Sequence, residues 1–157
     1  INSDGTTKNI SLKVGNDTRR LSVKIPKGIL PGKKIKIRGS KIGIGGNLYI
    51  RVNIENSTKY KLDGLNLTTQ VKLLPWEAAF GTEVLVDTIS GKIKVKIPKG
   101  IESGQKIRVP NKGYRDMNGN EGVLYIEMAI VNPSRLTNEE KKLYKKLKDI
   151  STYNPRE

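Results

Sequence analysis

Apolar and polar residues alternate in several short stretches of the chain. Leu21, Val23 and Ile25 occupy every second position before Pro26, and the same spacing returns in residues 48–54. A period of two places alternate side chains on opposite faces of a β-strand, so these stretches predict half-buried strands. Pro26 has no amide hydrogen to donate and marks where the first of these strands ends. The pattern is typical of a mostly β protein.

Two stretches of the chain repeat one another. Residues 21–35 (LSVKIPKGILPGKKI) recur as residues 93–107 (IKVKIPKGIESGQKI), with ten of the fifteen positions identical. A second block follows each copy, GNLYIRVNI at 46–54 and GVLYIEMAI at 122–130. Such self-similarity indicates a duplicated structural unit.

The repeat predicts the domain organisation. We expect two tandem, similar β-sandwich-like subdomains, the first at residues 1–58 and the second at residues 59–131. Residues 132–157 follow them as a C-terminal helix and tail. The second subdomain also contains a short helix at residues 75–81 (PWEAAFG), because proline suits a first helical turn and glycine a helix end. Its Trp76 and Phe80 are spaced i, i+4 and should pack against the sheet.

The C-terminal helix has a local start signal and an amphipathic pattern. Thr137 and Glu140 have the spacing of a capping box. Leu143, Tyr144 and Leu147 give one apolar face, opposite a face rich in lysine. This apolar face docks either on the chain's own subdomain or on a partner subunit, and the pattern alone leaves both open.

Composition limits the chemistry that the chain can perform. It contains 30 Lys and Arg against 15 Asp and Glu, a net charge of +15, with no histidine and no cysteine. Thiolate nucleophiles, Ser-His-Asp relays and Cys/His zinc sites are therefore excluded. The acidic residues form no catalytic or metal-binding constellation, so we expect no enzymatic activity, no cofactor and no metal.

The lysines alternate with Ile and Val instead of forming runs, which favours solvated strand faces over a phosphate-binding surface. No stretch approaches the roughly 20 apolar residues of a membrane span, and no secretory signal is visible. We expect a cytoplasmic protein without membrane contact.

Several blocks of the chain, in order, resemble the C-terminal substrate-binding region of DnaJ-type co-chaperones: VKIPKG, GNLYIRV, DGLNL, LPWEAAFGTEVLV, DTISGKIKVKIPKG and NPSRLTNEEKKLYKKL. The resemblance implies two similar β subdomains and a short dimerising helix, hence a homodimer with contacts from Leu143, Tyr144 and Leu147. Residues 15–18 directly join the strands between which zinc-bearing members insert their CxxCxGxG modules, so the chain resembles the zinc-free class. The family's J-domain with its HPD tripeptide is absent from this sequence, and the family's leading strand would precede Ile1.

The resemblance also implies a function. In the family, an extended segment of an unfolded client adds a strand beside the first subdomain, and the client is passed to a DnaK-class chaperone. Ile10, Leu12 and Ile50 match the groove-lining positions, although strand residues of this kind are otherwise ordinary core. Lys8 matches a basic position that holds the acidic C-terminal tail of the DnaK-class partner. Without the leading strand, the groove is expected to be incomplete.

Two other functions compete with client binding. Some zinc-free relatives bind curved DNA, and a charge of +15 suits nucleic acid. The third possibility is a structural oligomerisation domain without a client site. Client binding is the leading prediction, and DNA binding is the alternative.

Overall fold

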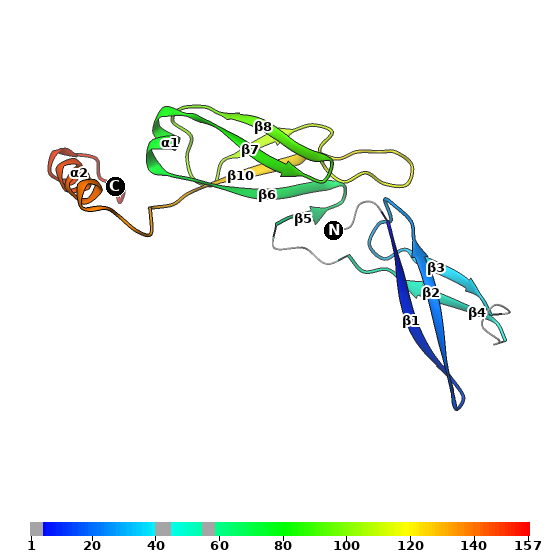
Figure 1. Cartoon of the computed structure of the whole chain (residues 1–157). Helices are drawn as coiled ribbons and strands as arrows, with labels where there is room; N and C mark the ends of the chain where they lie inside the picture. Colours follow the sequence, from blue (N-terminus) through cyan, green and yellow to red (C-terminus); the bar gives the residue numbers. More distant parts are fainter. Residues whose placement is uncertain (1–4, 40–44, 55–58) are drawn as a thin grey trace.

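The computed structural model describes residues 5–39, 45–54 and 59–157 (Figure 1). The described residues form, in chain order, β1 (Thr6–Val14), β2 (Asp17–Ile25), β3 (Lys34–Arg38), β4 (Asn47–Arg51), β5 (Lys61–Asp63), β6 (Asn66–Leu73), α1 (Pro75–Phe80), β7 (Thr82–Thr88), β8 (Gly91–Ile97), β9 (Lys106–Val109), β10 (Leu124–Ile130) and α2 (Asn138–Ile150). The predicted fold class is confirmed, because the protein is mostly β with a short helix in mid-chain and another near the C-terminal end. The predicted boundary at residue 58 lies outside the described residues, and the division into subdomains stays a prediction.

Two antiparallel hairpins make up the first half of the chain. In the first, β1 pairs with β2 and Ile10 lies opposite Leu21. In the second, β3 pairs with β4 and Ile35 lies opposite Ile50. Directly opposed residues of an antiparallel pair share a face, so each hairpin gathers its apolar residues on one side. The other side is polar, as in the first hairpin, where the Ser22 hydroxyl donates to Asn9 over 2.8 Å.

The second half contains a four-stranded sheet and a further hairpin. The sheet has the order β5-β6-β10-β9, and β7 pairs with β8. β6 and β10 are parallel, and together they supply much of the main core. The core side chains that are almost fully buried are Leu67, Leu73, Ile97, Tyr114, Leu124, Ile126 and Met128. Their burial makes this half the main hydrophobic core among the described residues.

The sequence repeat is also a repeat of strand pairing. Ile35 faces Ile50 across β3 and β4, and the corresponding Ile107 faces Ile126 across β9 and β10. The loop before each pair is held in the same way. The Gly32 amide donates to the Val52 carbonyl over 2.8 Å, and the Gly104 amide donates to the Met128 carbonyl over 2.7 Å. The two copies differ in one respect: β6 lies beside β10, whereas no corresponding strand lies beside β4 within the described residues.

Contacts of the loop after β2 tie the two halves together. The Tyr114 hydroxyl donates to the Ile29 carbonyl over 2.8 Å, and both residues are buried. Gly28 packs so closely on the Asp116 backbone that a Cβ there would lie 2.6 Å from the Asp116 carbonyl carbon. The loop after β2 is therefore seated on a turn of the second half.

The helix α1 forms where predicted, but the prediction for its side chains is wrong. Phe80 is 82% exposed and Trp76 is 42% exposed, so neither is packed into the sheet. Ala78 is the buried residue of the helix, and its carbonyl accepts from the Gly100 amide over 2.8 Å. Residues two positions apart in a helix point to nearly opposite faces. Burying Ala78 therefore turns Trp76 and Phe80 outward.

The helix α2 begins at the predicted capping box. The Thr137 hydroxyl accepts from the Glu140 amide over 3.1 Å, and the Glu140 carboxylate accepts from the Thr137 amide over 2.8 Å. This second hydrogen bond holds the pKa of Glu140 below its ordinary value. α2 lies apart from the sheets at the opposite end of the molecule from the β1–β4 hairpins (Figure 1), and none of its residues is buried. Neither described helix is long and apolar enough to cross a membrane.

Candidate functional site

A hollow of about 530 Å³ lies between the two hairpins of the first half. It is lined by residues 21–24 of β2 and residues 35–38 of β3. Side chains alternate between the faces of a strand, so a hollow lined by consecutive residues runs along the strand edges. Within the described residues, β2 pairs with β1 alone and β3 with β4 alone. We call this hollow the edge groove, because each strand turns an unpaired edge toward it.

The edge groove combines backbone hydrogen-bonding groups with apolar side chains. Leu21, Ile35 and Ile37 are partly buried residues of its lining. An unpaired strand edge presents amide hydrogens and carbonyls that another extended chain can use. The arrangement therefore offers both parts of a strand-addition site, namely backbone hydrogen-bonding groups along a strand edge and apolar contacts for alternate side chains of the added strand.

The predicted peptide-binding residues lie one strand away from this groove. Ile10 is directly opposite Leu21, and Ile50 is directly opposite Ile35. Leu12 lies further along β1, opposite Arg19. All three predicted side chains are partly exposed, so none is sealed in a core. Their role in peptide binding stays a prediction.

Lys8 lies on the same face of β1 as Ile10 and Leu12. It is exposed and stands opposite Val23, one of the residues that line the edge groove. It belongs to β1, one strand away from the groove lining. Its predicted role toward a partner's acidic tail is not tested by this placement.

Sequence reasoning missed Leu21, Ile35 and Ile37 as lining residues. The alternation identified them as strand positions, and two of them bound the first copy of the repeat. Which edge of a strand stays unpaired depends on contacts between distant segments, and the alternation does not contain that information.

The groove is set in a strongly basic half of the chain. Residues 5–54 contain twelve Lys and Arg and a single acidic residue, Asp17. Lys24, Lys36 and Arg38 belong to the groove lining itself. A positive potential at this surface attracts anionic ligands and is weakened by salt.

A second apolar hollow, of about 600 Å³, lies between the two helices. Trp76 and Phe80 of α1 face Leu143, Tyr144 and Leu147 of α2 across it. Leu143 and Leu147 are 62% and 56% exposed. The Tyr144 hydroxyl is buried and has no hydrogen-bond partner among the described residues. We call these five residues the helix surface.

The described residues offer no group of three or more acidic side chains that could hold a metal ion. Their perturbed titratable groups, such as Tyr60, Asp87 and Asp116, take part in local hydrogen bonds or core packing.

Comparison with known proteins agrees with these features. The model of the DnaJ C terminal domain matches residues 3–133. A curved DNA-binding protein of Pseudomonas putida (strain GB-1) is 34% identical over 155 residues, which cover 96% of this chain and 49% of the relative. Chaperone protein DnaJ 2 of Synechocystis is 33% identical over 141 residues, covering 90% of this chain and 46% of the relative.

The curved DNA-binding protein of Coxiella burnetii is 30% identical over 149 residues, covering 92% of this chain and 47% of the relative. The chain thus spans about half the length of these relatives. The relatives' names are those of a chaperone protein DnaJ and of curved DNA-binding proteins. The family match runs through both copies of the repeat and through the edge groove, and the chain belongs to the DnaJ C-terminal domain family.

Proposed function

We propose that the chain binds unfolded client polypeptides by adding a client segment as a strand in the edge groove. The observation that carries this proposal is that β2 and β3 each turn toward one hollow an edge that no other described strand pairs with. A folded protein has few extended segments to offer, whereas an unfolded one has many. Backbone pairing reads no sequence, and the apolar side chains of the groove select clients with exposed hydrophobic residues.

A labelled apolar peptide tests this proposal by fluorescence anisotropy. The variant Ile35→Asp places a carboxylate in the groove lining, and we expect it to weaken binding about tenfold or more, as the loss of one buried apolar contact predicts. The control Ser11→Asp adds the same charge to the exposed polar side of β1 and should leave the affinity unchanged. Binding should also persist in about 0.5 M salt, where interactions between exposed charges are screened.

A modified peptide tests the backbone contribution without altering the protein. Methyl groups on alternate peptide nitrogens remove hydrogen-bond donors and keep every side chain. We expect such a peptide to lose most of its affinity, because strand addition depends on main-chain hydrogen bonds. Equal binding of the methylated and unmethylated peptides would show that the groove does not work by strand addition.

The rest of the proposed function concerns partners. We propose that the chain acts as a non-enzymatic homodimer, with the helix surface as the dimer contact. It would hold clients for a DnaK-class chaperone, whose acidic tail would bind near Lys8. Lys8 is exposed on β1, one strand away from the groove, in the basic half of the chain, which favours contact with a carboxylate. The cytoplasmic location expected from the sequence stays a prediction.

DNA binding is the second candidate function, and the charge distribution favours it. Twelve basic residues against one acidic residue in residues 5–54 suit a polyanion. A duplex should then bind with an affinity that falls steeply with salt, because each neutralised phosphate releases counterions. A duplex that binds no more tightly than heparin at equal salt would rule out DNA as the specific ligand.

A further inference from the structure

The two copies of the repeat contain two equivalent hollows. Each lies in the loop that follows the Ile-Pro-Lys-Gly-Ile segment, and the two measure about 360 and 350 Å³. Six lining positions correspond one to one along the repeat. They are Pro26, Gly28, Ile29, Lys33, Lys34 and Ile35 in the first copy, and Pro98, Gly100, Ile101, Gln105, Lys106 and Ile107 in the second.

A turn of the second half closes one side of the first hollow. Asp116, Met117 and Asn118 complete its lining. The turn fits tightly, since a Cβ on Gly28 would lie 2.6 Å from the Asp116 carbonyl carbon and 2.8 Å from the Arg115 oxygen. The hydrogen bond from the Tyr114 hydroxyl to the Ile29 carbonyl adds a polar interaction to this contact. This loop is thus a receptor for a turn.

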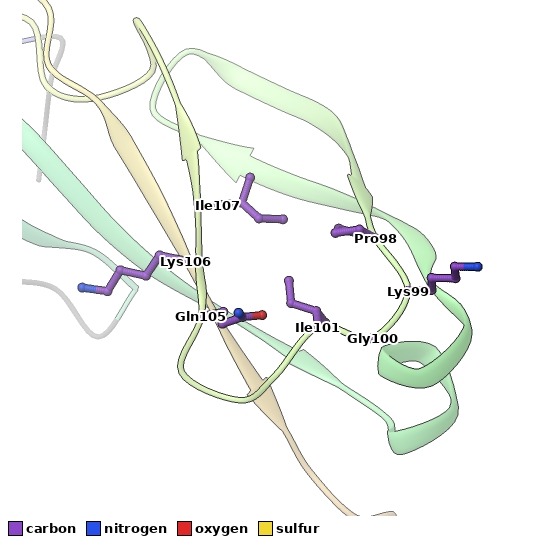
Figure 2. Close-up of a pocket in the computed structure, with 7 residues that line it drawn as sticks. All are labelled: Pro98, Lys99, Gly100, Ile101, Gln105, Lys106 and Ile107. Carbon is purple, nitrogen blue, oxygen red and sulfur yellow. The ribbon is translucent and has the colours of Figure 1, made fainter.

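The second hollow has a similar volume, but no turn of the described residues packs beside it. Gly100 has the same φ as Gly28, +78°, but no atom lies within 4 Å of where its Cβ would be. In the described part of the chain, no group donates to the Ile101 carbonyl, the counterpart of the Ile29 acceptor. Figure 2 shows Pro98, Ile101 and Ile107 directed into the hollow, while the amino groups of Lys99 and Lys106 point away from it.

The turn that packs beside the first hollow is organised by its own residues. The Asp116 carboxylate accepts from the Asn118 amide over 3.0 Å and from the Asn120 amide over 2.8 Å. Arg115 and Glu121 form an ion pair of 2.8 Å across its base. A turn held by these internal contacts reaches its receptor already folded, which lowers the entropy cost of docking.

We propose that the hollow at residues 98–107 is a second receptor, which binds an aspartate-led turn of a partner protein. The chain's own turn is already seated against Gly28, so the occupant comes from another polypeptide. The site takes a folded turn, whereas the edge groove takes an extended strand. It therefore lies beyond the proposed client-binding function and does not depend on it.

A cyclic peptide of residues 113–122 (GYRDMNGNEG) is the probe. Its ends already meet, because the Gly113 amide donates to the Gly122 carbonyl over 3.1 Å. With the full chain isotopically labelled, we expect the peptide to shift the amide signals of Gly100, Ile101 and Ile107 more than those of Gly28 and Ile29. A peptide with Asp116→Ala lacks the contacts that hold the turn and should bind at least about tenfold more weakly.

Two glycine variants of the protein form a matched pair. Gly100→Ala puts a methyl group where the docked turn's backbone would lie, and we expect it to weaken peptide binding about tenfold or more. Gly104→Ala is the control in the same loop. Gly104 also has a positive φ, of +89°, and neither it nor its counterpart Gly32 has an atom within 4 Å of a built Cβ. Both variants thus carry similar backbone strain, and only one blocks the site.

The peptide affinities of the two variants and the positions of the shifted signals decide whether the second receptor exists. Loss of binding in Gly100→Ala with retention in Gly104→Ala supports the second receptor. Equal affinity of both variants, signal shifts confined to the first hollow, or no binding of the cyclic peptide would each overturn it. Matching thermal melts of the two variants establish that the comparison concerns binding and not folding.

Discussion

At the scale of single residues, Lys59 and Asp87 form the closest ion pair among those measured. The Lys59 amino group lies 2.6 Å from the Asp87 carboxylate, and Lys92 lies 4.0 Å from it. The hydrogen bond from Lys59 holds the pKa of Asp87 below its ordinary value, and the same bond raises the pKa of Lys59. The Tyr60 hydroxyl donates to the Asp87 backbone carbonyl, so the segment before β5 is fastened to β7 at two points.

This pair predicts a pH dependence of stability. Because the pKa of Asp87 is lower in the folded state, its charge stabilises the fold above the ordinary Asp pKa of about 3.9. That contribution is lost as the pH falls through the lower, folded-state pKa. The variant Asp87→Asn should therefore melt slightly below the unchanged protein at pH 7, and the gap should close in acid.

Melting temperatures followed by circular dichroism at neutral and acidic pH measure this effect. Asp63→Asn is the control, because Asp63 is exposed on neighbouring β5 and forms no ion pair within the described residues. A gap between Asp87→Asn and the unchanged protein that stays constant from neutral pH to acid would contradict a contribution from the Asp87 charge.

At the scale of elements, local signals predicted what local interactions build. The start of α2 follows from Thr137 and Glu140, which bond to each other three residues apart. The strands follow from alternation, and the duplicated pairing follows from the repeat. These features could be predicted because each depends on residues that are close in sequence or repeated in it.

The same reasoning failed where distant segments compete for a surface. Trp76 and Phe80 have the spacing of a buried helix face, yet Ala78 is buried in their place, under the loop that carries Gly100. The free edges of β2 and β3 likewise depend on which strands pair, which alternation does not reveal. Most of the fold was thus predictable, whereas the lining of the candidate site was not.

At the scale of the whole molecule, the edge groove and the helix surface lie far apart. The basic residues 5–54 hold the edge groove, while the helix surface lies at the far end of the molecule (Figure 1). Binding of a client or a polyanion at one end therefore leaves the other free for a second subunit. This separation suits a dimer that presents two grooves and holds one client at two points, which raises its effective affinity.

The helix surface predicts how such a dimer is held. Leu143 and Leu147 are more than half exposed, and the buried Tyr144 hydroxyl lacks a partner within the described residues. Burial of exposed Leu and aromatic side chains is the main driving force for association. We therefore expect the full chain to sediment as a dimer and a chain that ends at Val131 to sediment as a monomer.

A point variant separates loss of the interface from loss of the segment. Leu143→Glu keeps α2 but places a charge in the helix surface. We expect it to raise the dissociation constant of the dimer about tenfold or more. Lys141→Glu changes charge on an exposed position of the same helix and should leave the dimer intact. If the chain ending at Val131 and Leu143→Glu both sediment as the full chain does, the dimer contact lies elsewhere. In that case the helix surface would play no part in assembly, and the exposure of Trp76 and Phe80 would have another cause.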